Sequence, residues 1–201
     1  MSSVIPEEVE PAGRVGFDPR KELIAAGSAG ARDAAGSRPA RALIVGATEV
    51  EIDVALADFF TDYYETVLEP EELVTEVRVP LPRLHTGSVY CKFLPRSADD
   101  YATVGVAVTV RLNASTGVCE DCRIAMGCVG VTPLRARQAE DIVRGQTQSD
   151  ALLREAASAA QSITDPLSDT RGSAAYKRAM AGVFVRRALE QAWQQALSTS
   201  T

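Results

Sequence analysis

The chain has 201 residues and a formal net charge of −6, with 46% apolar and 24% charged residues. This composition is close to the average of globular proteins, so it excludes wholesale disorder. The acidic balance and the 5% aromatic content exclude a general nucleic-acid binder, whose surface would be basic. The sequence contains no apolar run long enough to span a membrane and no export signal at its N-terminus. We therefore expect a cytoplasmic protein that has no membrane span and does not bind nucleic acid.

The N-terminal residues 1–46 show little periodicity, because glycine, serine and proline interrupt an alanine-rich stretch. We expect this segment to be poorly organised. Its glycines do not form the G-x-G-x-x-G pattern, so it predicts no phosphate-binding loop. Short apolar runs between residues 42 and 54 predict one or two strands.

The following segment predicts a small structured unit that ends near residue 83. Asp58 is placed to cap a short helical turn. Residues 73–79 alternate in polarity, which predicts a half-buried strand. Pro80 and Pro82 then end this strand, because proline lacks the N–H donor that a sheet ladder needs.

The second half of the chain predicts an antiparallel sheet followed by helices. Strands are expected at residues 88–93, 103–112 and 118–128, with Val104, Val106, Val108, Val110 and Leu112 on one face. Helices are expected after Pro133, after the capping residue Ser149 and after Ser173. The fold class is therefore α+β, with a three-stranded antiparallel sheet packed on a three-helix bundle.

The last helix is predicted to run far toward the C-terminus. It is expected to start at Ser173 and to carry Tyr176, Met180, Val183 and Phe184, with Leu189 and Trp193 further along.

The four cysteines raise the question of a metal site. Cys119, Cys122 and Cys128 form C-x2-C-x5-C, with Cys91 upstream, and the single histidine, His85, lies in another segment. A structural zinc site needs four converging ligands, usually as two tight pairs, and only one tight pair exists here. We expect reduced thiols within a sheet and no metal. A zinc-binding regulatory protein is the alternative.

One polar cluster lies between two predicted strands. It contains Lys92, Arg96, Asp99, Asp100 and Tyr101, and Lys92 is one of only three lysines in the chain. A lysine can donate to a carbonyl, a carboxylate can accept from a ring N–H, and a tyrosine can cover a ring. The cluster therefore suits a planar polar ligand. A solvated loop with local ion pairs explains the same residues equally well.

Four stretches of the chain carry a family resemblance in the right order and spacing: residues 58–80, 100–105, 132–136 and 165–176. They resemble the medium, FAD-binding subunit of molybdenum hydroxylases. Carbon monoxide dehydrogenase-type flavoprotein subunits are the more similar group, and the xanthine dehydrogenase flavin domain is more distant. The resemblance implies a C-terminal domain of three antiparallel strands and three helices, which agrees with the pattern.

The resemblance also implies a function. FAD in such a subunit takes electrons from iron–sulfur clusters of a small subunit, which a molybdenum cofactor in a large subunit supplies. The electrons pass to an external acceptor such as NAD or a quinone. By position, Tyr101 resembles the residue at the flavin ring, Lys92 and Asp100 resemble polar flavin contacts, and Val74 resembles an apolar contact.

The chain departs from the family in its N-terminal half. The two glycine-rich loops that hold the FAD pyrophosphate, A-G-G-x-S-L and T-x-G-G-N, are missing from the sequence. Because such loops present the N–H groups that bind anions, we expect weak or no FAD binding by this chain alone. The expected organisation is a divergent segment, a remnant of the FAD-binding domain and a C-terminal domain, at residues 1–46, 47–83 and 84–198.

Two functions remain open from the sequence. The first is a flavoprotein subunit component, inactive alone, that works with the small and large subunits and with a separately supplied N-terminal half. The second is a binding or assembly module that keeps the C-terminal fold without flavin. The two differ in whether the pyrophosphate-binding half is supplied from elsewhere.

Overall fold

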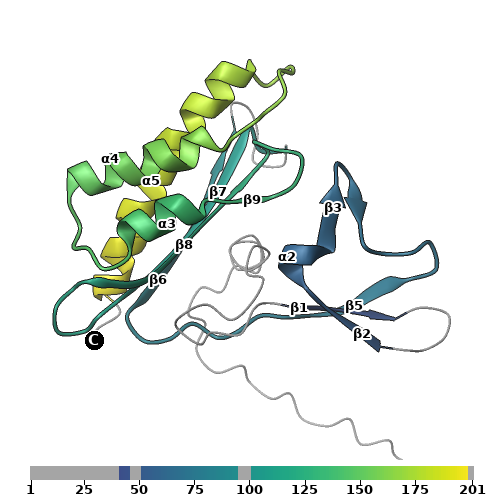
Figure 1. Ribbon diagram of the computed structural model, residues 1–201, viewed down its shortest axis with the longest axis horizontal. Coiled ribbons are helices and arrows are strands. Elements are labelled where there is room, and N and C mark those ends of the chain that lie inside the picture. The colour runs from purple at the N-terminus through teal and green to yellow at the C-terminus, as the bar shows by residue number, and fades with distance from the viewer. Residues whose placement is uncertain (1–40, 46–50, 95–100, 199–201) are drawn as a thin grey trace, which may run out of the picture.

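The computed structural model describes residues 41–45, 51–94 and 101–198. The predictions for residues 1–40 and for Asp100 therefore lie outside the described residues. The remaining elements form two groups that follow one another along the chain (Figure 1).

The first group is a small antiparallel sheet with one short helix and a hairpin. Its strand order is β2-β1-β5, with Ile44 of β1 opposite Ile52 and Val74. The elements are β1 Arg41–Val45, β2 Glu51–Ala55, α2 Leu56–Phe59, β3 Phe60–Asp62, β4 Glu65–Thr66 and β5 Leu73–Arg78. Leu56 and Phe59 of α2 pack on β1 and form a small core with Ala42 and Ile44.

Two predictions for this segment are corrected by the structure. Asp58 does not cap the helix, because α2 begins earlier, after Ala55, and contains Asp58 in its first turn. Strand β5 forms where it was predicted, yet all six of its residues are exposed instead of half-buried. It is an edge strand that pairs only with β1. The alternation of polar and apolar residues predicted the strand, but it did not predict how much of the strand is covered.

The second group is a larger sheet with three helices on one face (Figure 1). Its strand order is β6-β7-β8-β9, and every neighbouring pair is antiparallel. The elements are β6 Thr86–Phe93, β7 Val104–Leu112, β8 Cys119–Gly127, β9 Leu134–Arg135, α3 Arg137–Val143, α4 Asp150–Ser162 and α5 Ala174–Ser198. The α+β class, the three long strands and the three helices are therefore as predicted.

The region after Pro133 differs from the prediction. The helix begins only at Arg137, because Leu134 and Arg135 first pair with Met126 and Ala125 as a fourth strand. A two-residue strand has no periodicity of its own, so a helix assigned from Pro133 onward included it.

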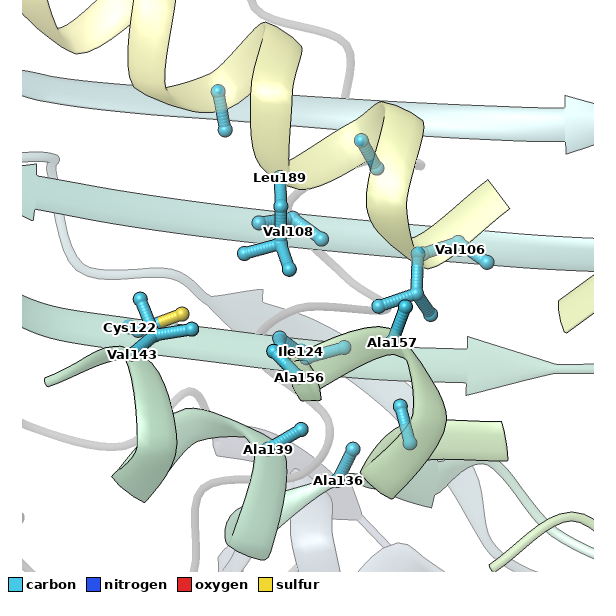
Figure 2. Close-up of a cluster of buried hydrophobic side chains, with 14 of the residues drawn as sticks. Val106, Val108, Cys122, Ile124, Ala136, Ala139, Val143, Ala156, Ala157 and Leu189 are labelled. Carbon is cyan, nitrogen blue, oxygen red and sulfur yellow. The ribbon is translucent and has the colours of Figure 1, made fainter. Parts of the chain in front are cut away.

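The core of the domain lies between the sheet and the helices. The valine face of β7 points into it as predicted, together with Ile124 of β8 and Leu189 of α5. Figure 2 shows Val106, Val108 and Ile124 pointing from the strands toward side chains of the helices. Because Val104, Val106, Val108 and Val110 are at most 1% exposed, this interface excludes water along the length of β7.

The apolar residues of helix α5 differ in how far they are buried. Leu189 and Trp193 lie in the core and Met180 and Phe184 pack against it, whereas Tyr176 and Val183 are 44% and 38% exposed. Apart from Lys177 and Val185, the other buried residues of α5 are small: Ala181, Gly182, Ala188, Ala192 and Ala196. Alanine shows little hydrophobic signal, yet only small residues let a helix backbone lie this close to a sheet.

The predicted starts of α4 and α5 are confirmed. Ser149 Oγ accepts a hydrogen bond from Leu152 N at 3.2 Å, and Ser173 Oγ accepts one from Tyr176 N at 3.2 Å. Gly145 follows α3 with a φ of +79°, a conformation that favours glycine. None of the helices in the described part of the chain is both long and apolar enough to span a membrane.

Candidate functional site

The structure brings two of the predicted site residues to the same end of the large sheet. Lys92 lies near the end of β6 and is opposite Gly105 of β7. Tyr101 lies just before β7, where Thr103 N donates to Phe93 O at 2.9 Å and continues the pairing of the two strands. Tyr101 is 73% exposed.

The other two predicted site residues are not placed in this cluster. Asp100 lies outside the described residues. Val74 belongs to the small sheet, where it lies opposite Ile44 on the edge strand β5 and is 38% exposed. The grouping of all four residues around one ligand therefore stays a prediction.

Arg171 is a functional candidate that the sequence reasoning missed. Its guanidinium carbon lies 5.7 Å from the centroid of the Tyr101 ring, which is a cation–π contact between the α4–α5 connection and the start of β7. The two segments are 70 positions apart in the chain, so no local pattern signalled the contact.

The turn that carries Arg171 is held by several hydrogen bonds. Asp169 and Gly172 exchange two backbone hydrogen bonds of 3.1 Å, and Asp169 Oδ1 accepts from Arg171 N at 2.8 Å. Lys177 Nζ lies 2.7 Å from Asp169 Oδ2 and donates to Leu167 O at 2.8 Å. Lys177 is only 5% exposed, so Asp169 and the carbonyl satisfy a buried ammonium group.

The pKa of Asp169 reflects this arrangement. The hydrogen bond from Lys177 and the one from the backbone of Arg171 lower the pKa of the Asp169 carboxyl. A lowered pKa in the folded chain stabilises the fold above the ordinary aspartate pKa of about 4, and this contribution is lost as the pH falls through the folded value.

We therefore expect Asp169→Asn to lower the free energy of unfolding at pH 7. The difference from wild type should shrink as the pH falls below about 4, because the wild-type carboxylate then becomes protonated. Urea unfolding between neutral and acidic pH measures this directly. Asp165→Asn is the matched control, since Asp165 is on the same connection and its side chain is 98% exposed. A difference that does not change with pH would contradict the role of the Asp169 charge.

An aromatic pair lies within electrostatic reach of the same site. Tyr63 and Tyr64 form the two-residue loop between β3 and β4, and their ring centroids are 4.5 Å apart. The hydrogen bond between their hydroxyls raises the pKa of Tyr64, and the positive charge of Arg171 opposes this increase. Tyr64 has a φ of 59°, which is unusual for a residue with a side chain.

Three cations influence the thiol that follows β8. Cys128 follows that strand, and burial raises the pKa of its thiol, while the charges of Arg171, Lys177 and Lys92 lower it. The same three cations therefore act on one point at this end of the sheet. The site has cationic and aromatic groups, which suit the binding of a flat, electron-rich ligand.

The cysteines do not form a metal centre in the part of the chain that the structure describes. Cys119 and Cys122 are buried, and the hydrogen bond between them together with burial raises the pKa of Cys122 well above its ordinary value. Among the described residues, no group of three or more His, Cys, Asp or Glu side chains could hold a metal ion.

Comparison with known proteins gives consistent relatives. The chain matches the family described as CO dehydrogenase flavoprotein C-terminal domain over residues 89–192. It is 41% identical to the carbon monoxide dehydrogenase medium chain of Afipia carboxidovorans over 69% of this chain and 47% of that relative. It is 31% identical to the nicotinate dehydrogenase FAD-subunit of Eubacterium barkeri over 45% of this chain and 31% of that relative.

A solved structure agrees with the sequence comparisons. Carbon monoxide dehydrogenase from Hydrogenophaga pseudoflava, in a form that lacks the Mo-pyranopterin moiety of its cofactor, aligns with a TM-score of 0.75 and 36% identity. The alignment covers 87% of this chain and 56% of that chain. The α+β fold and these relatives define the class, a domain of dehydrogenase medium subunits. The chain belongs to the CO dehydrogenase flavoprotein C-terminal domain family.

The match confirms the family resemblance predicted from the residues. The chain spans about half the length of the curated relatives it matches, 47% and 46% for the two carbon monoxide dehydrogenase medium chains. The whole-subunit properties of these relatives are therefore considered below as proposals.

FAD, which the family implies, fits the described residues at its ring end. The Tyr101 ring is open on the surface, and the Thr103 hydroxyl at the same end of β7 is buried with no hydrogen-bond partner among the residues that the structure describes. The pyrophosphate end fits less well. Within that same part of the chain, the glycines with positive φ are Gly117, Gly145 and Gly172, each isolated in a separate turn.

Proposed function

We propose that this chain is the C-terminal part of an FAD-binding medium subunit of a molybdenum hydroxylase. The observation that supports this most directly is the family match over residues 89–192. The cationic and aromatic site at the end of β6 and β7 supports it further, because a planar cofactor can bind there. When bound, FAD would supply the capacity to accept electrons from one protein centre and pass them to an external acceptor.

Each site residue has a defined task under this proposal. Tyr101 covers a face of the isoalloxazine ring, and Lys92 donates a hydrogen bond to a ring carbonyl. Asp100 accepts a hydrogen bond from the ring N–H, and Val74 contributes an apolar contact. None of these groups forms a nucleophile–base pair, so the chain orients the cofactor instead of acting on a substrate.

The proposal includes partner subunits. An iron–sulfur small subunit and a molybdenum-cofactor large subunit would pass electrons to the flavin, in the cytoplasm. A separate N-terminal half would supply the two glycine-rich loops that are missing from this sequence. Substrate chemistry would then belong to the large subunit.

A second function is supported by one specific observation. Because the sequence lacks both pyrophosphate loops, the chain could serve as an assembly module that binds the partner subunits without flavin. In that case, the surfaces of the C-terminal domain would matter and Tyr101 would not.

Replacement of Tyr101 tests the first function against the second. In a complex assembled with an N-terminal half that carries both loops, Tyr101→Ala should weaken FAD binding about threefold to tenfold, since an aromatic contact contributes about 0.5–1.5 kcal/mol. The measurement is the FAD content per complex, by visible absorbance, after gel filtration at graded FAD concentrations. Tyr101→Phe keeps the ring and is the control. Equal FAD affinity in wild type and Tyr101→Ala, or a complex without FAD, would favour the assembly module.

A further inference from the structure

We propose that Arg171 is a further binding residue of this site. Its guanidinium places a fixed positive charge near the ligand ring that Tyr101 covers. Lys177 is its positioning residue and acts through Asp169. The ligand class is a planar ring system that carries a negative charge, such as the reduced form of a flavin. This inference rests on the proposed function and adds a residue and a charge preference to it.

The first step is that the turn is built around the backbone of Arg171. Asp169 Oδ1 accepts from Arg171 N at 2.8 Å, and its other oxygen, Oδ2, lies 2.7 Å from Lys177 Nζ. Thus one carboxylate joins the buried ammonium group of α5 to the residue that faces Tyr101. The bridge between Asp169 and Gly172 closes the turn on both sides of Arg171.

The second step is that the surrounding residues anchor this turn to α5. Ser168 Oγ accepts from Ala174 N at 2.9 Å, and Ser173 caps the helix. Gly172 has a φ of +149°, and a methyl group on it would lie 2.8 Å from the Tyr176 ring. Because the backbone is held at so many points, the Arg171 side chain starts from a fixed position.

The third step concerns where the positive charge is presented. Lys177 Nζ lies 2.7 Å from Asp169 Oδ2, and the Arg171 guanidinium lies 4.0 Å from the same oxygen. The Arg171 guanidinium lies 5.7 Å from the centroid of the Tyr101 ring, so its charge is directed at the ring face.

The fourth step gives the ligand preference. A cation close to an aromatic ring ligand favours the form of that ligand with more negative charge. A flavin ring is neutral when oxidised and anionic when reduced at neutral pH. Arg171 should therefore strengthen the binding of the reduced ring relative to the oxidised ring.

Lys177 and Asp169, which hold Arg171 in place, are called the clamp here. Its role is tested in the full chain without any ligand. The five tyrosines are labelled with 3-fluorotyrosine, and the Tyr101 signal is assigned with Tyr101→Phe by ¹⁹F NMR. We expect Arg171→Gln and Lys177→Met to shift the Tyr101 signal in the same direction. Asp169→Asn breaks the same clamp and replaces Lys177→Met if that variant does not fold. An unchanged Tyr101 signal in both clamp variants would overturn the positioning role.

A matched control comes from the same helix. Arg187 on α5 forms a second cation–π contact, with its guanidinium carbon 5.4 Å from the Phe184 ring centroid. Arg187→Gln removes the same kind of charge and should leave the Tyr101 signal at its wild-type position. A shift of equal size in Arg187→Gln would show a general effect of lost charge and would contradict the proposal.

The ligand preference is tested with lumiflavin, which is the isoalloxazine ring without a phosphate chain. The ratio of reduced to oxidised affinity should fall about threefold to tenfold in Arg171→Gln, and it should not change in Arg187→Gln. An unchanged ratio in Arg171→Gln would overturn the charge preference. A wild-type chain that binds neither form would overturn the assignment of Arg171 to a flavin ring. The proposed function would be contradicted separately, by an assembled complex that contains no FAD.

Discussion

Gly87→Ala should destabilise the domain by about 3 kcal/mol, because β6 and α5 leave no space for a methyl group at this position. A Cβ atom on Gly87 would lie 1.9 Å from the backbone oxygen of Ala192 and 2.7 Å from the backbone nitrogen of Ala196. Backbone atoms cannot rotate away as side chains can, so the whole helix must move from the sheet. Since α5 also covers β7, we expect the packing of Trp193 to change too.

The measurement is the free energy of unfolding in urea, followed by the fluorescence of Trp193, the single tryptophan of the chain. Gly127→Ala is the matched control in the same sheet, because a methyl group there meets nothing within 4 Å. The control should leave stability unchanged or raise it by up to about 1 kcal/mol, as expected for glycine to alanine without strain. Equal stabilities of the two variants would contradict the close approach of α5 to β6.

Glu140→Ala should cost about 3–5 kcal/mol, since it leaves a half-buried arginine and a buried backbone N–H without their partner. The Glu140 carboxylate accepts from Ile124 N at 2.9 Å and from Arg135 Nη2 at 2.9 Å, and Arg135 Nε also donates to it. Glu140 is only 2% exposed, so water cannot take its place. This one side chain joins α3 to both β8 and β9.

The next residue supplies the control for this prediction. Asp141 forms an ion pair with Arg144 on the surface, with side chains that are 70% and 40% exposed. Asp141→Ala should therefore change the free energy of unfolding by less than about 0.5 kcal/mol. Urea unfolding of the two variants gives the comparison, and a Glu140→Ala cost below 1 kcal/mol would contradict the buried network.

Much of the large domain could be predicted from the sequence because its strong patterns are local. The alternation in β7 depends only on which residues face a covered side, and Val104 to Leu112 carry that alternation without interruption. Ser149 and Ser173 accept hydrogen bonds from residues three positions later, so their role also depends on nearby residues alone. The family resemblance also rested on local stretches, at residues 58–80, 100–105, 132–136 and 165–176, and the comparisons confirm it.

The incorrect predictions concern elements whose structure depends on residues far away in the sequence. Strand β9 exists because Arg135 pairs with Ala125, and the exposure of β5 follows from its place at a sheet edge. The alanine face of α5 is buried because the backbone of α5 lies against Gly87. A hydrophobicity scale assigns a value to each residue alone and cannot predict such a contact between two backbones.

The candidate site divides in the same way. Sequence alone determined the family, the α+β class and the choice of Lys92 and Tyr101, since these depend on residue identity and order along the chain. Only the tertiary structure placed Arg171 over Tyr101 and joined it to Lys177 through Asp169. The physical reason is distance along the chain. Tyr101 and Arg171 are 70 residues apart, so their contact depends on how the sheet and the helices pack, and the local sequence around either residue does not indicate the other.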